Sequence, residues 1–306
     1  MASESPNVLS PMDSHLVKII ICAFLAIIPV IMWGYIFLKR SGEPVGTVIL
    51  TFIAGMVSVA PIILYKLSWQ YFPELNLFNY FDEYSGNVLG FTGLLYLPLS
   101  TLLSFFLVGM IEEYMKHLAV KTVDNGRFKS IDDSIEYAIV AALGFSFIEN
   151  TMYFFYIWHY QGIDTLYLSF VFRSVFSTFA HILFSGIYGY YYGLAYFAEP
   201  VYQEEIRTQR HPFIKLLHNI LNLRSSTIFA QEKRTQGLFY AIVLHAFFNV
   251  MLEMDMTFLM IPFLILGYSA LTYLITQKRN HVKYGRVRGG MSEGLASIRG
   301  AEDVER

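Results

Sequence analysis

The chain has 306 residues, of which 55% are hydrophobic and 17% aromatic, whereas only 15% are charged. A soluble domain of this length could not cover so much apolar surface with so few charged side chains. The net charge of −2 gives no reason to expect a nucleic acid as a partner.

Apolar segments follow one another along most of the chain, and a segment needs about 20 apolar residues to cross a bilayer. Seven segments qualify: 16–38, 46–69, 88–111, 135–158, 166–197, 237–254 and 257–276. The tail 1–15 is polar, and no small-residue cleavage site follows the first segment, so we interpret that segment as a retained span rather than a signal peptide. The fifth segment is longer than a span requires, which predicts that it tilts or continues past the membrane. The pattern predicts an all-α, polytopic transmembrane helical bundle of about seven spans.

Basic residues alternate between the connections. Lys and Arg follow the first, third, fifth and seventh segments, and the three connections between those carry none. By the positive-inside rule, the N-terminus is then outside and the C-terminus in the cytoplasm. Residues 198–235 form the largest cytoplasmic connection, in which apolar side chains at helical spacing over 213–221 predict an amphipathic helix on the membrane surface. The tail 277–306 is rich in Gly, Arg and Glu and is expected to be disordered, which leaves 16–276 as the membrane domain.

Ionisable side chains occur inside four successive segments. Glu112 and Glu113 close the third, Glu149 lies within the fourth, and His181 and His245 are central in the fifth and sixth. Such groups are costly at membrane depth, so they usually face one another or a wet cavity. We expect them to converge in the core of the bundle, where side chains of facing helices build metal and proton-transfer sites.

The spacing within the third segment separates the roles of its polar residues. Adjacent Glu112 and Glu113 point about 100° apart on a helix, so one can bind a metal or orient a partner while the other handles a proton. Lys116 lies one turn from both and can pair with either carboxylate. Because the single cysteine, Cys22, offers no cysteine zinc motif, any metal must be held by His, Glu, Asp or Asn.

Two further pairs share a helix face at a spacing of four residues. Phe145 and Glu149 place an aromatic side chain beside the carboxylate, and His245 and Asn249 place an amide beside the imidazole. An imidazole with an amide one turn away can bind a metal and also hold a carbonyl oxygen. The sequence has no HExxH motif, so a metal site must be assembled from several helices.

Taken in order, these motifs resemble those of the PrsW family of intramembrane proteases, which is itself similar to the CAAX-prenyl-protease membrane peptidases. The family pattern is EExxK, then FxxxE, then an HxxxD-type motif, each on a separate transmembrane helix. Asn249 departs from this pattern, because it replaces a common Asp and removes a charge. The matching residues span roughly 100–255 and are Glu112-Glu113-x-x-Lys116, Phe145-x-x-x-Glu149-Asn150, His181 and His245-x-x-x-Asn249.

The resemblance implies an intramembrane endopeptidase that hydrolyses a peptide bond of a membrane-associated protein or peptide, in a prokaryotic plasma membrane. It implies that Glu112 is the general base, that Glu113 assists it as a metal ligand or second carboxylate, and that Asn249 stabilises the oxyanion. Since the family has been described as both metallo- and glutamic-type proteases, a metal-free mechanism stays open. Four side chains would bind a divalent metal, expected to be zinc, or position the water directly: Glu113, Glu149, His181 and His245. Three would position the others: Lys116, Phe145 and Asn150.

The same cluster also fits a different class of function. A proton- or metal-coupled transporter could use Glu149, His181 and His245 as a relay, but transporter folds usually show internal repeats and broken spans, which we do not find in this sequence. A non-enzymatic scaffold would have no use for buried carboxylates. The intramembrane protease is therefore our first hypothesis and the transporter the second.

Two features of the fifth segment are interpreted as structural. Arg173 lies near the outer end of that segment, where its long side chain could snorkel to the interface. Gly189 and Gly193 form one GxxxG motif, which permits another helix to pack closely.

The predicted boundaries place the acidic groups at different depths. Glu112 and Glu113 fall near the inner face, whereas Glu149 falls past mid-depth toward the outer face. The groups can meet only if the third helix begins later than residue 88, if the fourth begins near Tyr137, or if the helices tilt.

Overall fold

The computed structural model describes residues 11–39, 43–76, 88–91, 95–124, 126–199, 201–202, 225–254 and 256–277. The first part of the chain forms helices α1 (Pro11–Leu38), α2 (Val45–Val57) and α3 (Ala60–Ser68), the 3-10 turn η1 (Pro73–Leu75), and strands β1 (Val88–Phe91) and β2 (Leu95–Pro98). The remainder forms α5 (Leu99–Asp124), α6 (Ile131–Tyr160), α7 (Ile163–Phe172), the π-helical turn η2 (Arg173–Ser177), α8 (Thr178–Tyr196), α11 (Ser225–Glu253) and α12 (Thr257–Gln277).

Helices long and apolar enough to cross a membrane dominate the described part of the chain. There are six such stretches: His15–Leu38, Val45–Ser68, Ile131–Tyr160, Ile163–Tyr196, Ser225–Glu253 and Thr257–Gln277. Helix α5 is a seventh long helix, and it is less apolar because it carries Glu112, Glu113 and Lys116. These helices confirm the predicted all-α architecture of an integral, multi-pass membrane protein with about seven long helices.

The predicted boundaries of the third segment, 88–111, are wrong. Its first part forms an antiparallel hairpin in which Val88 pairs with Pro98, and the helix begins only at Leu99 and continues to Asp124. Pro98 has no amide hydrogen to donate within a helix, which favours a helix start after it. Glu112 and Glu113 therefore lie at the middle of α5 rather than at its end.

Other boundaries shift for local reasons. Helix α6 begins at Ile131, earlier than the predicted residue 135, because Ser130 and Asp133 form a capping box in which each side chain accepts from the other's backbone N–H. Helix α11 begins at Ser225, so the end of the predicted loop 198–235 is helical. The amphipathic helix predicted over 213–221 and the tails 1–10 and 278–306 lie outside the described residues.

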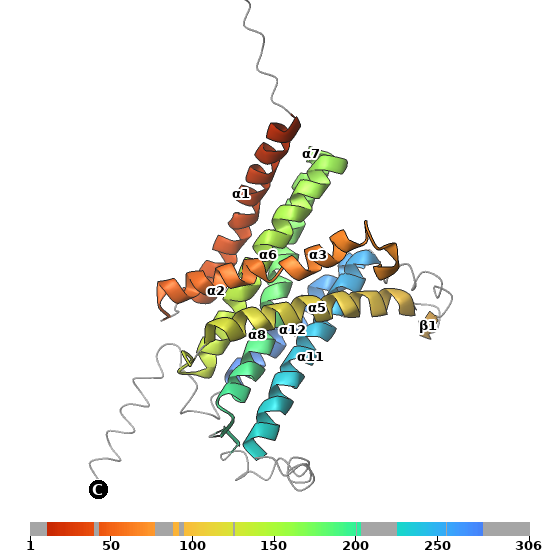
Figure 1. Ribbon diagram of the computed structural model, residues 1–306. Helices are drawn as coiled ribbons and strands as arrows, with labels where there is room; N and C mark the ends of the chain where they lie inside the picture. Colours follow the sequence, from red (N-terminus) through yellow and green to blue (C-terminus); the bar gives the residue numbers. More distant parts are fainter. Residues whose placement is uncertain are drawn as a thin grey trace, which may run out of the picture.

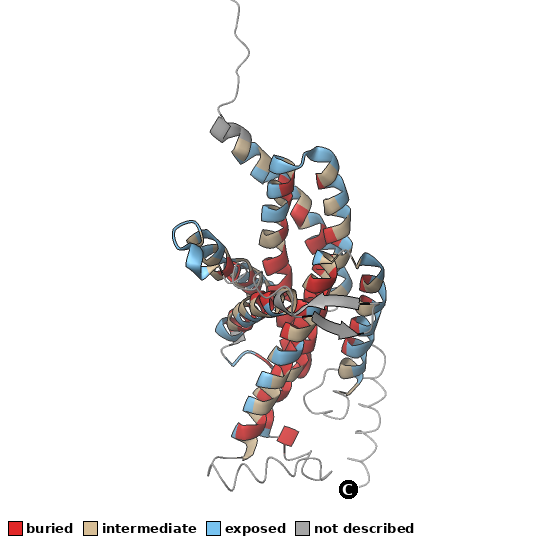
Figure 2. Cartoon of the chain, turned by 90° about the vertical axis from the view of Figure 1, so that its right-hand side faces the viewer, coloured by how far each residue is buried: buried red, intermediate tan, exposed pale blue. Residues whose placement is uncertain are grey.

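The helices α6 and α8 form the centre of the molecule. Helix α8 packs along both α6 and α11, while α1 and α2 pack on the other side of α6. Helix α5 and the α2–α3 pair lie crosswise over this centre, so that α5 contacts α11, α2 and α6 (Figure 1). Buried residues run along the central helices, and exposed residues gather on the outer ones (Figure 2).

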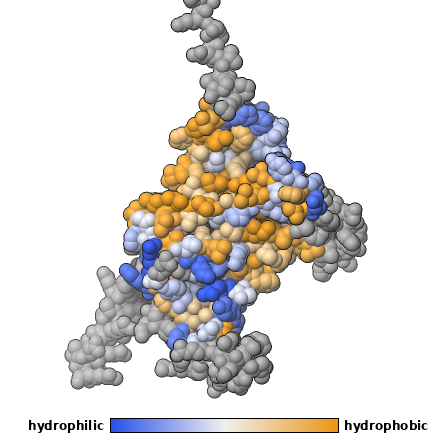
Figure 3. All heavy atoms as spheres, in the orientation of Figure 1, coloured by the Kyte–Doolittle hydropathy of each residue, from blue (hydrophilic) through white to orange (hydrophobic). Residues whose placement is uncertain are grey.

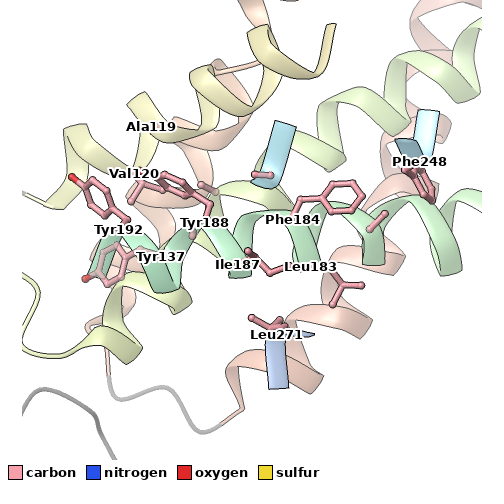
Figure 4. Packing of buried hydrophobic residues seen from close by; sticks show 14 of the residues in the cluster. Ala119, Val120, Tyr137, Leu183, Phe184, Ile187, Tyr188, Tyr192, Phe248 and Leu271 are labelled. Atoms are coloured by element: carbon pink, nitrogen blue, oxygen red, sulfur yellow. The ribbon is translucent and has the colours of Figure 1, made fainter. Parts of the chain in front are cut away.

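The largest apolar cluster joins α5, α6, α8, α11 and α12. Figure 4 shows Phe184 and Phe248 toward one end of this cluster, and the aromatic rings of Tyr188, Tyr192 and Tyr137 toward the other. The face of the molecule in Figure 3 is largely hydrophobic across its middle, with hydrophilic residues gathered near its lower end. An apolar belt with polar ends is what contact with lipid requires.

Close contact between α6 and α8 confirms the packing predicted from the GxxxG motif. The Ser134 hydroxyl donates to the backbone oxygen of Gly189 over 2.7 Å. A Cβ added at Gly189 would lie 2.8 Å from Cα of Ile135, which is closer than a methyl group allows. The two backbones therefore touch at this point, and α8 is held firmly against α6.

Helix α2 crosses α6 equally closely at Gly144, where an added Cβ would lie 2.1 Å from the backbone oxygen of Phe52. We predict that Gly144→Ala forces the two helices apart and destabilises the protein by about 1–3 kcal/mol, the usual cost of overpacking. Thermal unfolding in detergent measures the change. Gly46→Ala is the matched control in α2, because a Cβ there meets nothing within 4 Å. Equal melting temperatures for both variants would contradict the crossing.

Candidate active site

The polar centre of α5 faces the interior of the bundle. Glu112, Glu113 and Lys116 are all buried, whereas Tyr114 between them points outward and is exposed. Lys116 Nζ donates to Glu113 Oε1 over 2.5 Å, so the lysine pairs with the carboxylate three residues before it. Lys116 therefore neutralises Glu113 and not Glu112, a choice that spacing alone left open.

His245 of α11 lies between the two carboxylates. Its Nδ1 is 2.7 Å from Glu113 Oε1, and its Nε2 is 3.4 Å from Glu112 Oε2. Glu112 Oε2 is buried, and no hydrogen-bond partner for it occurs among the described residues. The two adjacent glutamates thus lie at opposite edges of one imidazole, and the buried oxygen of Glu112 can accept a hydrogen bond from a water molecule.

His181 of α8 completes the centre of the site. Its Nδ1 is 3.3 Å from Lys116 Nζ, and its Nε2 is 3.0 Å from Glu149 Oε2. The ring centroid of His181 lies 5.1 Å from that of His245 and 5.4 Å from that of Phe145. Of the four helices expected to converge, α5, α8 and α11 bring their ionisable side chains together, and α6 adds Glu149 through its contact with His181.

Within the described part of the chain, one group of side chains could hold a metal ion. Glu113, His181 and His245 each offer one ligand atom, and these atoms all lie within 4.8 Å of one another. Two histidines and one glutamate are a common ligand set of catalytic zinc. The chemistry of this donor set and the buried, unpartnered oxygen of Glu112 fit zinc. Lys116 Nζ, which now lies beside Glu113 and His181, would have to withdraw.

Glu149 lies outside this group of three and contacts the site through His181. Its Oε2 is also 2.8 Å from Nη2 of Arg173, which is only 7% exposed. The interpretation of Arg173 as a snorkelling residue is therefore wrong. A buried guanidinium needs a charged partner, and Glu149 on the neighbouring helix supplies it.

The remaining predicted residues surround these groups. Phe145 is fully buried, and Lys116 Nζ lies 4.8 Å from its ring centroid, so this aromatic side chain borders the lysine and His181. Asn150 lies behind Glu149 and accepts a hydrogen bond from Arg173 Nε over 2.7 Å. Asn249 follows His245 by one turn of α11 and is half-buried.

Three polar side chains of the site were missed in the sequence: Arg173, Ser146 and Thr178. A signal for them existed, because the amide of Asn150 in an apolar helix needs several hydrogen-bond partners. The sequence could not say which residues of another helix provide them.

Comparisons with known proteins agree with this geometry. The sequence pattern of the PrsW family of intramembrane metalloproteases matches residues 43–275, a range that contains every site residue named above. The protease PrsW of Geobacillus kaustophilus is 28% identical over 173 residues, which cover 55% of this chain and 64% of that relative. This chain thus matches slightly less than two thirds of the relative's length. No solved structure matches the chain. Because the family pattern covers most of the sequence, the chain belongs to the PrsW family of intramembrane metalloproteases.

Proposed function

We propose that the protein is an intramembrane endopeptidase that hydrolyses a peptide bond of a membrane-associated protein or peptide. One observation supports this proposal most directly: two carboxylates and two imidazoles from α5, α8 and α11 lie buried next to one another. Charged groups at membrane depth are rarely kept without a function. Membership of the PrsW family favours peptide hydrolysis over proton- or metal-coupled transport.

Glu113, His181 and His245 would hold the zinc ion in this proposal, and Glu149 would support it through His181. Zinc, when bound, would lower the pKa of a water molecule to about 7 and polarise the scissile carbonyl. A set of three protein ligands leaves one position for water or substrate. Glu149 remains a candidate fourth ligand if its contact with His181 rearranges.

Glu112 would act as the general base. Its Oε2 is buried and has no hydrogen-bond partner in the described structure, so it can accept the proton of the attacking water. As the water oxygen bonds to the carbonyl carbon, that proton moves to Glu112. It then passes to the amine nitrogen when the C–N bond breaks. The amide of Asn249, one turn from His245, would donate to the oxyanion. Phe145 would keep His181 in place, and Lys116 would pair with Glu113 until the metal binds.

The charge distribution favours one orientation in the membrane. Basic side chains mark the α5–α6 connection, with Arg127 and Lys129, and the first half of α11, with Lys233 and Arg234. Basic residues near helix ends face the cytoplasm more often than the outside. We propose that this end of the bundle is cytoplasmic and that the protein resides in a prokaryotic plasma membrane, with its substrate in the same bilayer.

Glu112→Gln should leave the protein folded and able to bind zinc but lower kcat for a cleaved peptide by about 10²–10⁴-fold, because general-base catalysis contributes that much. The variant and wild type are compared in detergent with equal zinc content. Glu232→Gln is the control, since this more exposed carboxylate pairs with its neighbour Lys233 in α11, away from the site. Unchanged cleavage by Glu112→Gln would remove the general base from the proposal.

Stripping the protein with a chelator should abolish cleavage, and added zinc should restore it. His245→Ala should lower both zinc content and activity, since it removes one of three ligands. Metal content and peptide cleavage are measured on the same samples. Full activity of metal-free protein would instead favour a glutamic-type mechanism, in which Glu112 and Glu113 position the water directly. A transporter would be favoured if the wild-type protein cleaved no peptide but carried protons or zinc into liposomes, and if Glu149→Gln abolished this uptake.

A further inference from the structure

Arg173 lies in a widened turn of the long helix that runs from Ile163 to Tyr196. The five residues of η2 are π-helical, and the backbone N–H of Thr178 bonds to the carbonyl of Arg173 five residues earlier. Side chains satisfy the carbonyls of this turn: Thr178 Oγ1 donates to Arg173 O over 3.1 Å, and Trp33 Nε1 donates to Ser174 O over 2.8 Å. Single π-helical turns inside α-helices occur often at functional sites.

The guanidinium group of Arg173 contacts one stretch of α6, where its Nε, Nη2 and Cζ atoms each have a different partner. Nε donates to Asn150 Oδ1 over 2.7 Å, and Nη2 lies 2.8 Å from Glu149 Oε2. Cζ lies 4.1 Å from the ring centroid of Tyr153. A planar guanidinium with a hydrogen bond, an ion pair and a ring contact has very little freedom to rotate.

A closed hydrogen-bond network fixes Asn150 in turn. Its Nδ2 donates to Ser146 Oγ over 3.2 Å and to Thr178 Oγ1 over 3.1 Å, and all three residues are fully buried. Ser146 Oγ also donates to Thr178 Oγ1 over 3.1 Å. Each hydroxyl has one hydrogen to give, and Thr178 gives its hydrogen to the backbone of Arg173. Reversing the amide of Asn150 would turn its NH₂ group toward Arg173 Nε, so only one orientation satisfies the network.

The network acts on the active site through Glu149. One oxygen of this carboxylate, Oε2, forms the ion pair with Arg173 Nη2 and also lies 3.0 Å from His181 Nε2. Because an ionised carboxylate only accepts hydrogen bonds, the hydrogen of the imidazole must be on Nε2. Lys116 Nζ, a donor, faces the other nitrogen, Nδ1, at 3.3 Å. Both neighbours therefore require the same tautomer, with the lone pair of Nδ1 directed toward the group that includes Glu113.

Glu149 could not hold this geometry alone. Its side chain is 26% exposed, so without Arg173 it could turn toward water or lipid headgroups and leave His181 free to rotate. A carboxylate that bonds the far nitrogen of a histidine ligand sets both the tautomer and the orientation of the ring.

We propose that Arg173 is a positioning residue, which holds Glu149 against His181 and so presents Nδ1 of His181 to the metal and substrate. This inference rests on the proposed function. The alternative is that Arg173 is a buried ion pair that merely ties α8 to α6. The two differ in whether the effect of Arg173 passes through Glu149.

The test is a double-mutant cycle on full-length protein in detergent, using Arg173→Gln, Glu149→Gln and the combination. We expect Arg173→Gln to weaken zinc binding by about 10–100-fold, the usual loss when the partner of a metal-bound histidine is removed. It should lower kcat by a similar factor while KM changes less than twofold. In the Glu149→Gln background, Arg173→Gln should have no further effect on zinc affinity. Tyr137→Phe is the control, since Tyr137 lies elsewhere on α6 and loses a partly buried hydrogen bond to Glu43 in this variant.

Two results would overturn the proposal. Arg173→Gln could lower only the melting temperature, which is the result expected for Tyr137→Phe, and leave zinc affinity and kcat unchanged; Arg173 is then structural. Alternatively, the losses in the double variant could add in full, and Arg173 then does not act through Glu149. If Arg173→Gln does not fold, Tyr153→Leu replaces it, because Tyr153 is exposed and its ring lies against the guanidinium. That variant should weaken zinc binding several-fold, and no change would equally overturn the proposal.

A separate readout distinguishes failure of this inference from failure of the proposed function. Wild-type protein that neither binds zinc nor cleaves peptides would end the proposed function. The nitrogen resonances of the His181 ring, assigned with His181→Gln, still report whether its hydrogen is on Nε2. In Arg173→Lys, which keeps the charge but loses the Nε donor, part of the hydrogen should move to Nδ1. Because Lys116 also favours hydrogen on Nε2, the measurement is repeated with Lys116→Met. An unchanged tautomer in both Arg173 variants in that background would contradict the positioning role.

Discussion

The cost of burying charge in a membrane protein governs the rest of this structure. An unpaired carboxylate or ammonium group inside an apolar bundle costs several kcal/mol, so each buried charge must have a partner within a few ångströms. Glu113 has Lys116 and His245, Glu149 has Arg173 and His181, and Glu112 retains a buried oxygen, Oε2, without a hydrogen bond among the described residues. This buried oxygen makes Glu112 the candidate base of the cluster.

This compensation depends on helix packing that brings distant backbones close together. Helix α8 lies against both α6 and α11, and its contact with α6 at Gly189 leaves no room for a side chain. Such close approach lets short polar groups, such as the hydroxyl groups of Ser146 and Thr178, bond directly across the interface. The small residues of α6 and α8 therefore allow the close packing of the two helices and also the hydrogen bonds behind the site.

The long helix from Ile163 to Tyr196 combines two tasks at its π-helical turn. The turn changes the helical register between its two ends, and it places Arg173 in the interior while Thr178 and Trp33 satisfy its carbonyl groups. The same helix then carries His181 less than one turn after Thr178. A local irregularity of the backbone is thereby linked to the orientation of a candidate metal ligand.

The sequence alone determined the class of the protein and most of its site. Long apolar segments can be stable only in lipid, and glutamate or histidine inside them must meet partners, so Glu112, Glu113, Glu149, His181 and His245 could be identified without coordinates. Which partner each one meets was decided only by the tertiary structure. Lys116 could reach either glutamate on α5, and Arg173 could have pointed to the interface. The chain folds so that α5 begins after Pro98 and η2 turns Arg173 inward. Such contacts join residues far apart in sequence, and helical periodicity carries no information on them.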